Sequence, residues 1–550
     1  MLRAAISRLA RQPVLAALVL FLVGVVCNAL PALRFGAPLP ALHDEFGYLF
    51  LGETFARGRL TNDPPPGPPE FFETFHEFIT PRYIAKFPPG QGIALAVGIL
   101  LGHPIFGIWL VSGLWMVALV WMLRAAAPPG WAIGGALTAV IGYGVMTYWG
   151  NSYWGGSVMA LGGALTFGGA LRLWQREGNP IAAAIGAGVG CAIMALTRPF
   201  DGFVFALFPT GMIAWTLWRD RVGALVRLAA FCIPTIAGIT LLLGYNLTTT
   251  GSPWQFAHQL YDRTHVPGLA LFVWDKPAPD PPGLPDFLAN YERGKYGIFG
   301  PSMGANPLTL PLYLSNLKEY IGLQFNALFP IWIWPLVGLG VLAALAARDG
   351  PARLALLSLL FISIPLLTLR FYGFSHYAAA WTAPAMLLLI RGAQPQKVFK
   401  LKPGAGSPAL VWLMAIILAL WPVTSTANVL AHGYPQWEWT NYAWVFDREL
   451  VRQELAERAE QTGRPQMAIV VYAPDHNPHI EWVFNSPDVL TQDVLWIRAL
   501  GPARVPELAR LFPQHDEWLV YVKANGTLDH RDLIFTPNVT GAKSTSAVQK

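Results

Sequence analysis

Charged side chains are scarce in this chain. Only 13% of its 550 residues are Asp, Glu, Lys or Arg, whereas soluble domains carry about a quarter. The mean hydropathy is +0.42, and apolar runs near the length that crosses a bilayer recur from Val14 to Thr424. The scarcity of charge excludes an ordinary soluble protein and predicts a polytopic membrane protein.

Cysteine is nearly missing as well. The three cysteines, Cys27, Cys191 and Cys232, all lie in apolar runs, so the sequence predicts no disulfide framework. A Gly-rich phosphate loop of the Walker or Rossmann type is also lacking between a predicted strand and a helix. That absence disfavours a nucleotide-driven pump and an enzyme that uses a soluble nucleotide sugar.

The small surplus of positive charge is spread over many loops. The net charge is +6 and the pI about 9.1, but the basic residues form no single cluster. Such scattering follows the positive-inside rule of membrane proteins and is not typical of a nucleic-acid-binding surface. We therefore expect membrane lipid, and no nucleic acid, among the partners.

The loop charges also orient the spans. Arg3, Arg8 and Arg11 precede the first apolar run, over about Pro13 to Leu30, which places the N-terminus in the cytoplasm. From the apolar runs we expect a polytopic all-α fold with about 11 transmembrane helices within residues 1–425. We expect this multi-pass protein in the plasma (inner) membrane.

Two long segments interrupt the apolar runs. Residues 31–89 and 246–322 are predicted to be large extracytoplasmic loops. The apolar stretch from Gly90 to Leu101 is short for a span, so it is predicted to be a half-buried or interfacial helix. With this topology, every polar cluster able to support chemistry lies on the outer face of the membrane.

From about residue 435 onward the composition becomes that of a soluble protein. Residues 435–537 are predicted to form a small α/β domain on the extracytoplasmic side, while the role of that domain stays open. The polar residues 538–550 are predicted to be a frayed, disordered tail. The expected elements are helices over 446–463 and 505–511 and strands over 467–472, 494–500 and 518–522.

The acidic pair Asp44-Glu45 directly follows the first span. Neighbouring residues on a helix are about 100° apart, so the two carboxylates cannot both face one site. Asp44 instead shares a face with Tyr48 at i, i+4. We expect partial desolvation to raise the proton affinity of Asp44 and suit it to act as a general base. The alternative is a helix N-cap, and Glu45 either supports the site or caps the helix.

Two basic residues lie at turns on the same predicted face. Lys86 precedes a Pro-Pro-Gly turn, where it can contact a phosphate as a compact point charge or snorkel at the start of an interfacial helix. Arg198 lies between two apolar helices, where a charge is costly unless it is paired. It can pair with Asp201, or it can hold a phosphate that Asp201 helps to orient.

Two further clusters of aromatic and polar residues lie on this face. Arg370 or His376 can stabilise an anionic leaving group, with Tyr377 as a substrate contact, or they can form a basic rim at the membrane interface. The segment 149–154 is aromatic and favours an interfacial belt, while carbohydrate stacking stays open. Its candidate substrate contacts are Asn151, Tyr153 and Trp154.

Together these motifs resemble the GT-C glycosyltransferases over about residues 1–391. The nearest likeness is to family-39-like and rhizobial lipopolysaccharide-transferase-like bacterial enzymes, relatives of protein O-mannosyltransferases and lipid A aminoarabinose transferases. By this resemblance Asp44 matches the catalytic aspartate of the first loop, and Lys86 matches a lysine near the donor phosphate. The match is looser at Arg198, Arg370 and His376. The Pro-rich stretch 63–70 departs from the family pattern and leaves the acceptor side open.

The resemblance implies a reaction. A hexosyl or pentosyl group would pass from a polyprenyl-phosphate-linked donor to an envelope acceptor, either a lipid, a glycan or a protein, on the extracytoplasmic face. Asp44 would take the proton of the attacking hydroxyl, while Lys86 and an arginine would stabilise the leaving phosphate. Direct displacement would invert the anomeric centre. No nucleotide cofactor is implied, and the need for a divalent cation is left undecided.

Two other classes of protein are compatible with a membrane chain that gathers charges. A transporter or lipid flippase would show internal repeats and broken helices at the midplane, and we find no clear repeat in the sequence. A non-catalytic membrane scaffold would leave Asp44 dispensable. The glycosyltransferase is therefore the leading hypothesis.

Overall fold

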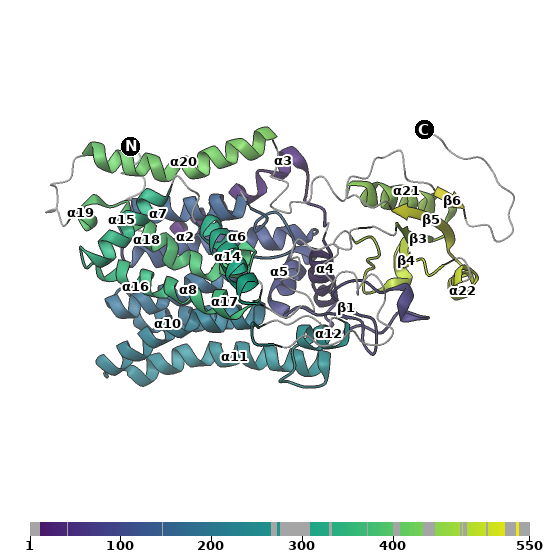
Figure 1. Cartoon of the computed structure of the whole chain (residues 1–550), viewed down its shortest axis with the longest axis horizontal. Helices are drawn as coiled ribbons and strands as arrows, with labels where there is room; N and C mark the ends of the chain where they lie inside the picture. The colour runs from purple at the N-terminus through teal and green to yellow at the C-terminus, as the bar shows by residue number, and fades with distance from the viewer. Residues whose placement is uncertain are drawn as a thin grey trace.

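The computed structural model describes most of the chain outside the second loop and the tail. The predicted disordered tail, 538–550, lies outside the described residues. A helical bundle occupies one end of the long axis and a small sheet with its helices the other (Figure 1). The described residues are 12–40, 42–145, 147–265, 272–275, 309–328, 333–370, 372–399, 408–432, 446–473, 476, 481–501, 504–522 and 535–537.

Six helical segments are long and apolar enough to cross a membrane, so the chain is a multi-pass membrane protein. They are Pro13–Phe35 (α2, Pro13–Ala29, with α3, Ala32–Phe35), α6 (Pro104–Arg124), α9 (Pro180–Thr197), α10 (Pro199–Arg219), α11 (Ala224–Thr250) and Gly350–Thr368 (α16, Gly350–Leu360, with α17, Ser363–Thr368). Shorter apolar helices are α5 (Pro89–Leu100), α15 (Trp334–Leu345) and the first part of α20 (Pro408–His432).

Further helices complete the bundle. They are α7 (Pro129–Ala139), which continues as a π-helix over Val140–Val145, α8 (Ser157–Gln175), α14 (Leu310–Leu328), the 3₁₀ segment Ser375–Trp381, α18 (Thr382–Gly392) and α19 (Pro395–Val398). Helix α8 packs against α6, α9 and α10. This close approach needs small residues, since a Cβ on Gly169 would lie 2.3 Å from the carbonyl oxygen of Ala183.

The described parts of the second loop, 246–322, contain helices. Helix α11 extends to Thr250, α12 spans Ala257–His265, and α14 begins at Leu310. The predicted loop 246–322 therefore begins and ends with helical residues, which the change in hydropathy did not indicate.

The first loop contains the helix that carries Asp44. Helix α4 spans His43–Ala56, and ten of its 14 residues are buried, so neighbouring segments cover it on most sides. Helix α5 covers one side: a Cβ on Gly52 would lie 2.8 Å from the Cβ of Leu95. The remainder of the loop holds a 3₁₀ turn over Pro69–Phe71 and the antiparallel strands β1 (Glu77–Phe78) and β2 (Ile84–Ala85).

The C-terminal domain (described residues 446–537) is built on a four-stranded sheet of order β4-β3-β5-β6. The central strand β3 is parallel to β4 and β5, and β6 runs antiparallel to β5. The strands are β3 (Gln466–Tyr472), β4 (Val494–Arg498), β5 (Asp516–Val522) and β6 (Phe535–Pro537), with helices α21 (Phe446–Thr462) and α22 (Val505–Leu511). Apart from β6, these elements nearly coincide with those predicted from periodicity.

In Figure 1, α4 and β1 lie between the helical bundle and this sheet. The first loop therefore joins the two ends of the molecule.

Candidate functional site

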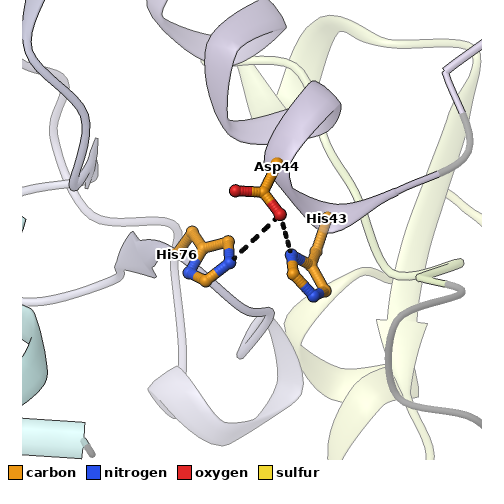
Figure 2. Close-up of side chains that lie close together, drawn as sticks. All are labelled: His43, Asp44 and His76. Atoms are coloured by element: carbon orange, nitrogen blue, oxygen red, sulfur yellow. Dashed lines mark ion pairs between the residues drawn. The ribbon is translucent and has the colours of Figure 1, made fainter. Parts of the chain in front are cut away.

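Three side chains meet at the first turn of α4 (Figure 2). Oδ2 of Asp44 lies 2.9 Å from Nδ1 of His43 and 3.6 Å from Nε2 of His76. His43 and Asp44 open the helix, whereas His76 comes from the loop before β1. We call these three residues the Asp44 cluster.

The backbone at His76 is held in an unfavourable conformation. Its φ of 70° lies in the left-handed region, which costs an L-residue about 1–2 kcal/mol. The carbonyl oxygen of His76 accepts a 2.8 Å hydrogen bond from the backbone N–H of Lys86, so the hairpin that ends in Lys86 holds this turn in place. Strain of this kind gathers at functional sites, and here it accompanies an imidazole that reaches Asp44.

The cluster is largely removed from water, with His43 and His76 only 3% and 5% exposed. Burial raises the pKa of the Asp44 carboxyl, but the charges and hydrogen bonds of His76 and His43 outweigh burial and hold that pKa well below its usual range. Burial, with the charges of Lys86 and His43, holds the pKa of His76 well below its usual range, although Asp44 opposes this. At neutral pH, Asp44 is therefore ionised and His76 is a neutral imidazole.

This result corrects one expectation. The sequence predicted that desolvation would raise the proton affinity of Asp44, and that prediction is wrong because two histidines contact the carboxylate. His43 had no assigned role and His76 was missed. The only sequence signal for His76 was a histidine between Pro-rich turns of the first loop, and it pointed to no particular partner.

The Asp44 cluster also has the composition of a cation site. One ligand atom from each of the three residues lies within 4.8 Å of the other two. A neutral imidazole, as at His76, and an ionised carboxylate are protonation states that metal binding requires. A set of two histidines and one carboxylate suits a transition metal and leaves coordination positions open. The residues therefore fit a divalent cation.

Lys86 lies at the junction of the two large loops. Its Nζ is 3.6 Å from Oδ1 of Asp262 on α12 and 4.9 Å from the ring centre of Tyr261. Only 13% of the side chain of Lys86 is exposed, so it points into the protein. The sequence contained Asp262 but did not indicate that it pairs with Lys86.

Arg198 pairs with Asp201, the first of its two predicted roles. Its Nε lies 2.7 Å from Oδ2 of Asp201, and its guanidinium lies 4.2 Å from the ring centre of Tyr377. Burial is the main cause that raises the pKa of the Tyr48 phenol, and the nearby charge of Arg198 opposes the rise. The structure therefore brings together four predicted residues, which are Arg198, Asp201, Tyr377 and Tyr48.

His376 and Arg370 occupy different surroundings. Nδ1 of His376 lies 2.6 Å from the hydroxyl of Tyr148, and its ring packs 4.9 Å from that of Trp154. Burial and the charge of Arg198 hold the pKa of His376 well below its usual range, so it is a neutral imidazole. Arg370 donates hydrogen bonds to the carbonyl oxygens of Phe272 and Asp275 in the second loop.

Glu45 lies in a capping position. Its Oε2 accepts a 3.4 Å hydrogen bond from the backbone N–H of Leu42, ahead of the helix, and its Oε1 accepts a 3.2 Å bond from the backbone N–H of Tyr153. The cap was one of the two roles left open for Glu45. The second bond ties the start of α4 to the aromatic segment 149–154.

That aromatic segment is buried inside the protein. Trp149, Tyr153 and Trp154 are 1%, 2% and 7% exposed, so the interpretation as an interfacial belt is wrong. Asn151 is buried too, and among the described residues its side-chain amide has no hydrogen-bond partner. A buried amide without a partner is costly, and Asn151 remains a predicted substrate contact.

Comparisons with known proteins give distant likenesses. No protein-family model matches the sequence, and no curated protein matches it. Similar solved structures are the oligosaccharyltransferase of Archaeoglobus fulgidus in the apo form (13% identity, TM-score 0.44, covering 92% of this chain and 69% of that one) and ArnT of Cupriavidus metallidurans in the apo state (12% identity, TM-score 0.45, covering 92% of each chain). Another is AglB of Archaeoglobus fulgidus with an inhibitory peptide and a dolichol-phosphate (12% identity, TM-score 0.43, covering 92% and 69%).

These solved enzymes are GT-C glycosyltransferases.

Proposed function

We propose that this chain is a membrane glycosyltransferase that transfers a sugar from a polyprenyl-phosphate-linked donor to an envelope acceptor. The observation that supports this most is the Asp44 cluster, an ionised carboxylate held between two imidazoles. The backbone of Lys86 is bonded to that of His76, and the charge of Lys86 helps to lower the pKa of His76, so a cation lies near the cluster. An anion for the nucleophile and a cation for a phosphate are the two charges that glycosyl transfer from a lipid phosphate needs.

In the proposed reaction the acceptor hydroxyl attacks the anomeric carbon as the bond to the phosphate oxygen breaks. The electron pair of that bond leaves on the lipid phosphate, where Lys86 and Arg198 offset the charge. Direct displacement inverts the anomeric centre. The hydroxyl proton becomes strongly acidic as the new bond forms, so Asp44 can accept it in spite of its low pKa. The same carboxylate stabilises positive charge on an oxocarbenium-like sugar.

The proposal includes a divalent cation held by the Asp44 cluster. Such a cation would act as a Lewis acid toward a phosphate oxygen. The protein's own part is to present the ionised oxygen of Asp44 and the ring nitrogens of His43 and His76 at one point. Zinc is a candidate because imidazole ligands suit it, and manganese is a second because it favours a carboxylate such as that of Asp44.

The proposed site lies on the extracytoplasmic face, with about 11 transmembrane helices, a cytoplasmic N-terminus and an extracytoplasmic C-terminal domain in the plasma (inner) membrane. The transferred group is a hexosyl or pentosyl unit, and the acceptor is a lipid, glycan or protein of the envelope.

The test replaces Asp44 in the full chain. We expect Asp44→Asn to reduce transfer from a polyprenyl-phosphate sugar by a factor of about 10²–10⁴ in reconstituted membranes. The matched control is Asp63→Asn, an exposed aspartate of the same loop, which should transfer at the wild-type rate. A deletion strain should accumulate the lipid-linked sugar. Unchanged transfer by the Asp44 variant would rule out the catalytic assignment, and lipid movement without sugar transfer would favour a flippase.

A further inference from the structure

The C-terminal domain contacts both segments that carry the Asp44 cluster. Helix α4 supplies His43 and Asp44, while the loop before β1 supplies His76. The domain holds α4 near each end, and it holds the loop at Glu73.

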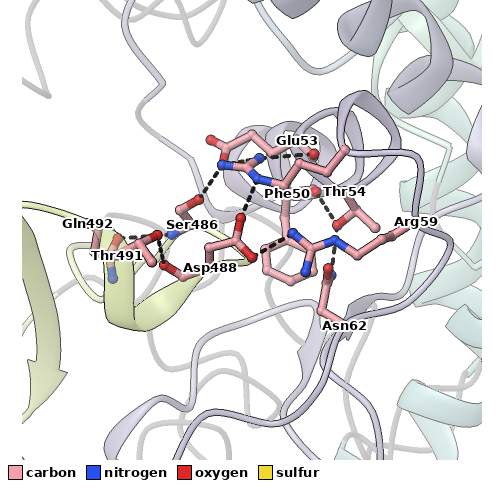
Figure 3. Close-up of polar contacts among 10 residues, drawn as sticks. Phe50, Glu53, Thr54, Arg59, Asn62, Ser486, Asp488, Thr491 and Gln492 are labelled. Atoms are coloured by element: carbon pink, nitrogen blue, oxygen red, sulfur yellow. Dashed lines mark hydrogen bonds and ion pairs between the residues drawn. The ribbon is translucent and has the colours of Figure 1, made fainter.

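At the far end of α4, a loop of the domain binds arginines (Figure 3). The carboxylate of Asp488 lies 2.6 Å from Nε of Arg57 and 2.6 Å from Nη2 of Arg59. The hydroxyl of Ser486 donates a 2.7 Å hydrogen bond to Glu53 and accepts one of 3.1 Å from Arg57. The domain thus meets the last turn of α4 and the two arginines just beyond it with charge-assisted bonds, which are stronger than neutral ones.

The loop that carries Asp488 is itself held to the sheet. The backbone N–H of Ser486 donates to the side-chain oxygen of Gln492, whose amide donates to Asn485. The side chain of Asn485 then donates to the carbonyl oxygen of Trp496 in β4 and accepts from its N–H. A carboxylate anchored in this way loses little freedom when it binds, so its ion pairs can position α4.

Near the start of α4, the domain contacts Phe46, two residues after Asp44. The rings of Phe46 and Phe484 stack with their centres 4.6 Å apart. The buried guanidinium of Arg448 lies 5.0 Å from the centre of Phe46 and 4.4 Å from that of Trp496. It also donates hydrogen bonds to the carbonyl oxygens of Trp482 and Phe484, so its orientation is fixed by the domain.

The first loop is bound at a third point. Arg498, at the end of β4, donates two hydrogen bonds of 3.0 and 3.1 Å to the carbonyl oxygen of Glu73. Its guanidinium also lies 3.2 Å from the carboxylate of Glu481. Glu73 lies three residues before His76 in the sequence. The domain is therefore bonded to both segments that carry the cluster, α4 and the first loop.

We propose that the C-terminal domain positions the Asp44 cluster. It sets α4 relative to the first loop, and Asp488 and Arg448 are its positioning residues. The physical reason lies in the burial of α4. Helix α5 and the first loop cover part of the helix, as at Gly52 and Phe50, and the domain adds cover at Phe46 together with specific bonds at the other end. The role of the cluster in catalysis rests on the proposed function, but the positioning does not.

The test compares two surface aspartates of the domain in the full chain. Asp488→Ala removes the two ion pairs that the domain makes just beyond the end of α4. The matched control, Asp516→Ala, removes the 2.8 Å ion pair with Arg464 at the start of β5. We expect hydrogen exchange in residues 43–50 to become about fivefold faster in the Asp488 variant, from the loss of two partly exposed ion pairs. The control should exchange there as the wild type does, and Asp488→Glu should restore protection.

A second measurement reports the geometry of the cluster. The affinity for Mn²⁺, followed by electron paramagnetic resonance, should fall by a similar factor in Asp488→Ala and stay unchanged in Asp516→Ala. If Asp488→Ala also speeds hydrogen exchange in strand β3, the Arg59→Ala variant decides between a local and a global effect. It breaks one of the two ion pairs of Asp488 from the first-loop side and should speed exchange in residues 43–50 by a smaller factor.

Wild-type exchange in residues 43–50 of both Asp488→Ala and Arg59→Ala would overturn the positioning role. If the wild type itself bound no Mn²⁺, the cation of the proposed function would be wrong, while the exchange experiment would still decide the positioning.

Discussion

Nζ of Lys86 lies 3.6 Å from Oδ1 of Asp262. This pair joins the first loop to helix α12 of the second loop, and it offsets the positive charge that a donor phosphate would meet. A phosphate must therefore share Lys86 with Asp262 or displace it.

The affinity for the lipid-phosphate donor should respond in opposite directions to changes in this pair. Asp262→Asn should tighten donor binding several-fold, because Lys86 keeps its charge and loses its competing partner, and Lys86→Gln should weaken it. Binding of a polyprenyl-phosphate sugar to purified protein in nanodiscs, at several salt concentrations, measures both effects. Weaker binding by the Asp262 variant would show instead that this carboxylate serves to place the lysine.

Chelation should remove activity if the Asp44 cluster holds a cation. We expect a chelator to abolish sugar transfer and Mn²⁺ or Zn²⁺ to restore it, with Mg²⁺ less effective because two ligands are imidazoles. His76→Ala should need a higher concentration of the cation, since one ligand is lost. Full activity in the chelator would contradict the cation and leave the carboxylate chemistry of Asp44 to be tested by its own variant.

Glu45 should matter for stability more than for the chemical step. Its two bonds to backbone N–H groups predict that Glu45→Gln lowers the free energy of unfolding by about 1–2 kcal/mol, with kcat kept within a few-fold. Thermal unfolding and initial rates on the same sample separate the two effects. Glu460→Gln, on an exposed face of α21, is the control that should change neither. A collapse of kcat without loss of stability would make Glu45 catalytic.

The stability of the protein should fall in mild acid because of His376. The pKa of this buried imidazole lies well below its usual range, so the unfolded chain binds the proton more readily than the folded one. Stability from this group is fully present above the ordinary pKa of about 6.5 and is lost as the pH falls below it. His376→Asn should flatten the dependence of the melting temperature on pH between 7.5 and 5, values taken as about one unit or more on each side of that pKa. An unchanged slope would assign the acid sensitivity to other groups.

The sequence by itself was sufficient for features that depend on local composition. Hydropathy located α2, α6 and α9, since a span needs only a continuous apolar stretch of sufficient length. Periodicity located the helices and the first three strands of the C-terminal domain for the same reason. An acidic pair after the first span was enough to single out Asp44.

Tertiary structure decided which residues share a site. His76 reaches Asp44 only because the chain turns through a left-handed residue, and Asp262 reaches Lys86 only because α12 folds back onto the first loop. These contacts join segments far apart in the chain, and no local propensity encodes them.

The same dependence on tertiary contacts explains why the predicted proton affinity of Asp44 was wrong. Its carboxylate follows the first span in the sequence, which predicted a desolvated base with a high proton affinity. The pKa of a carboxyl depends on the groups that surround it in space, and here two histidines outweigh burial. The sequence determined that an acid stands at this position, and the fold decided that it is ionised, paired and held in place by a domain from the other end of the chain.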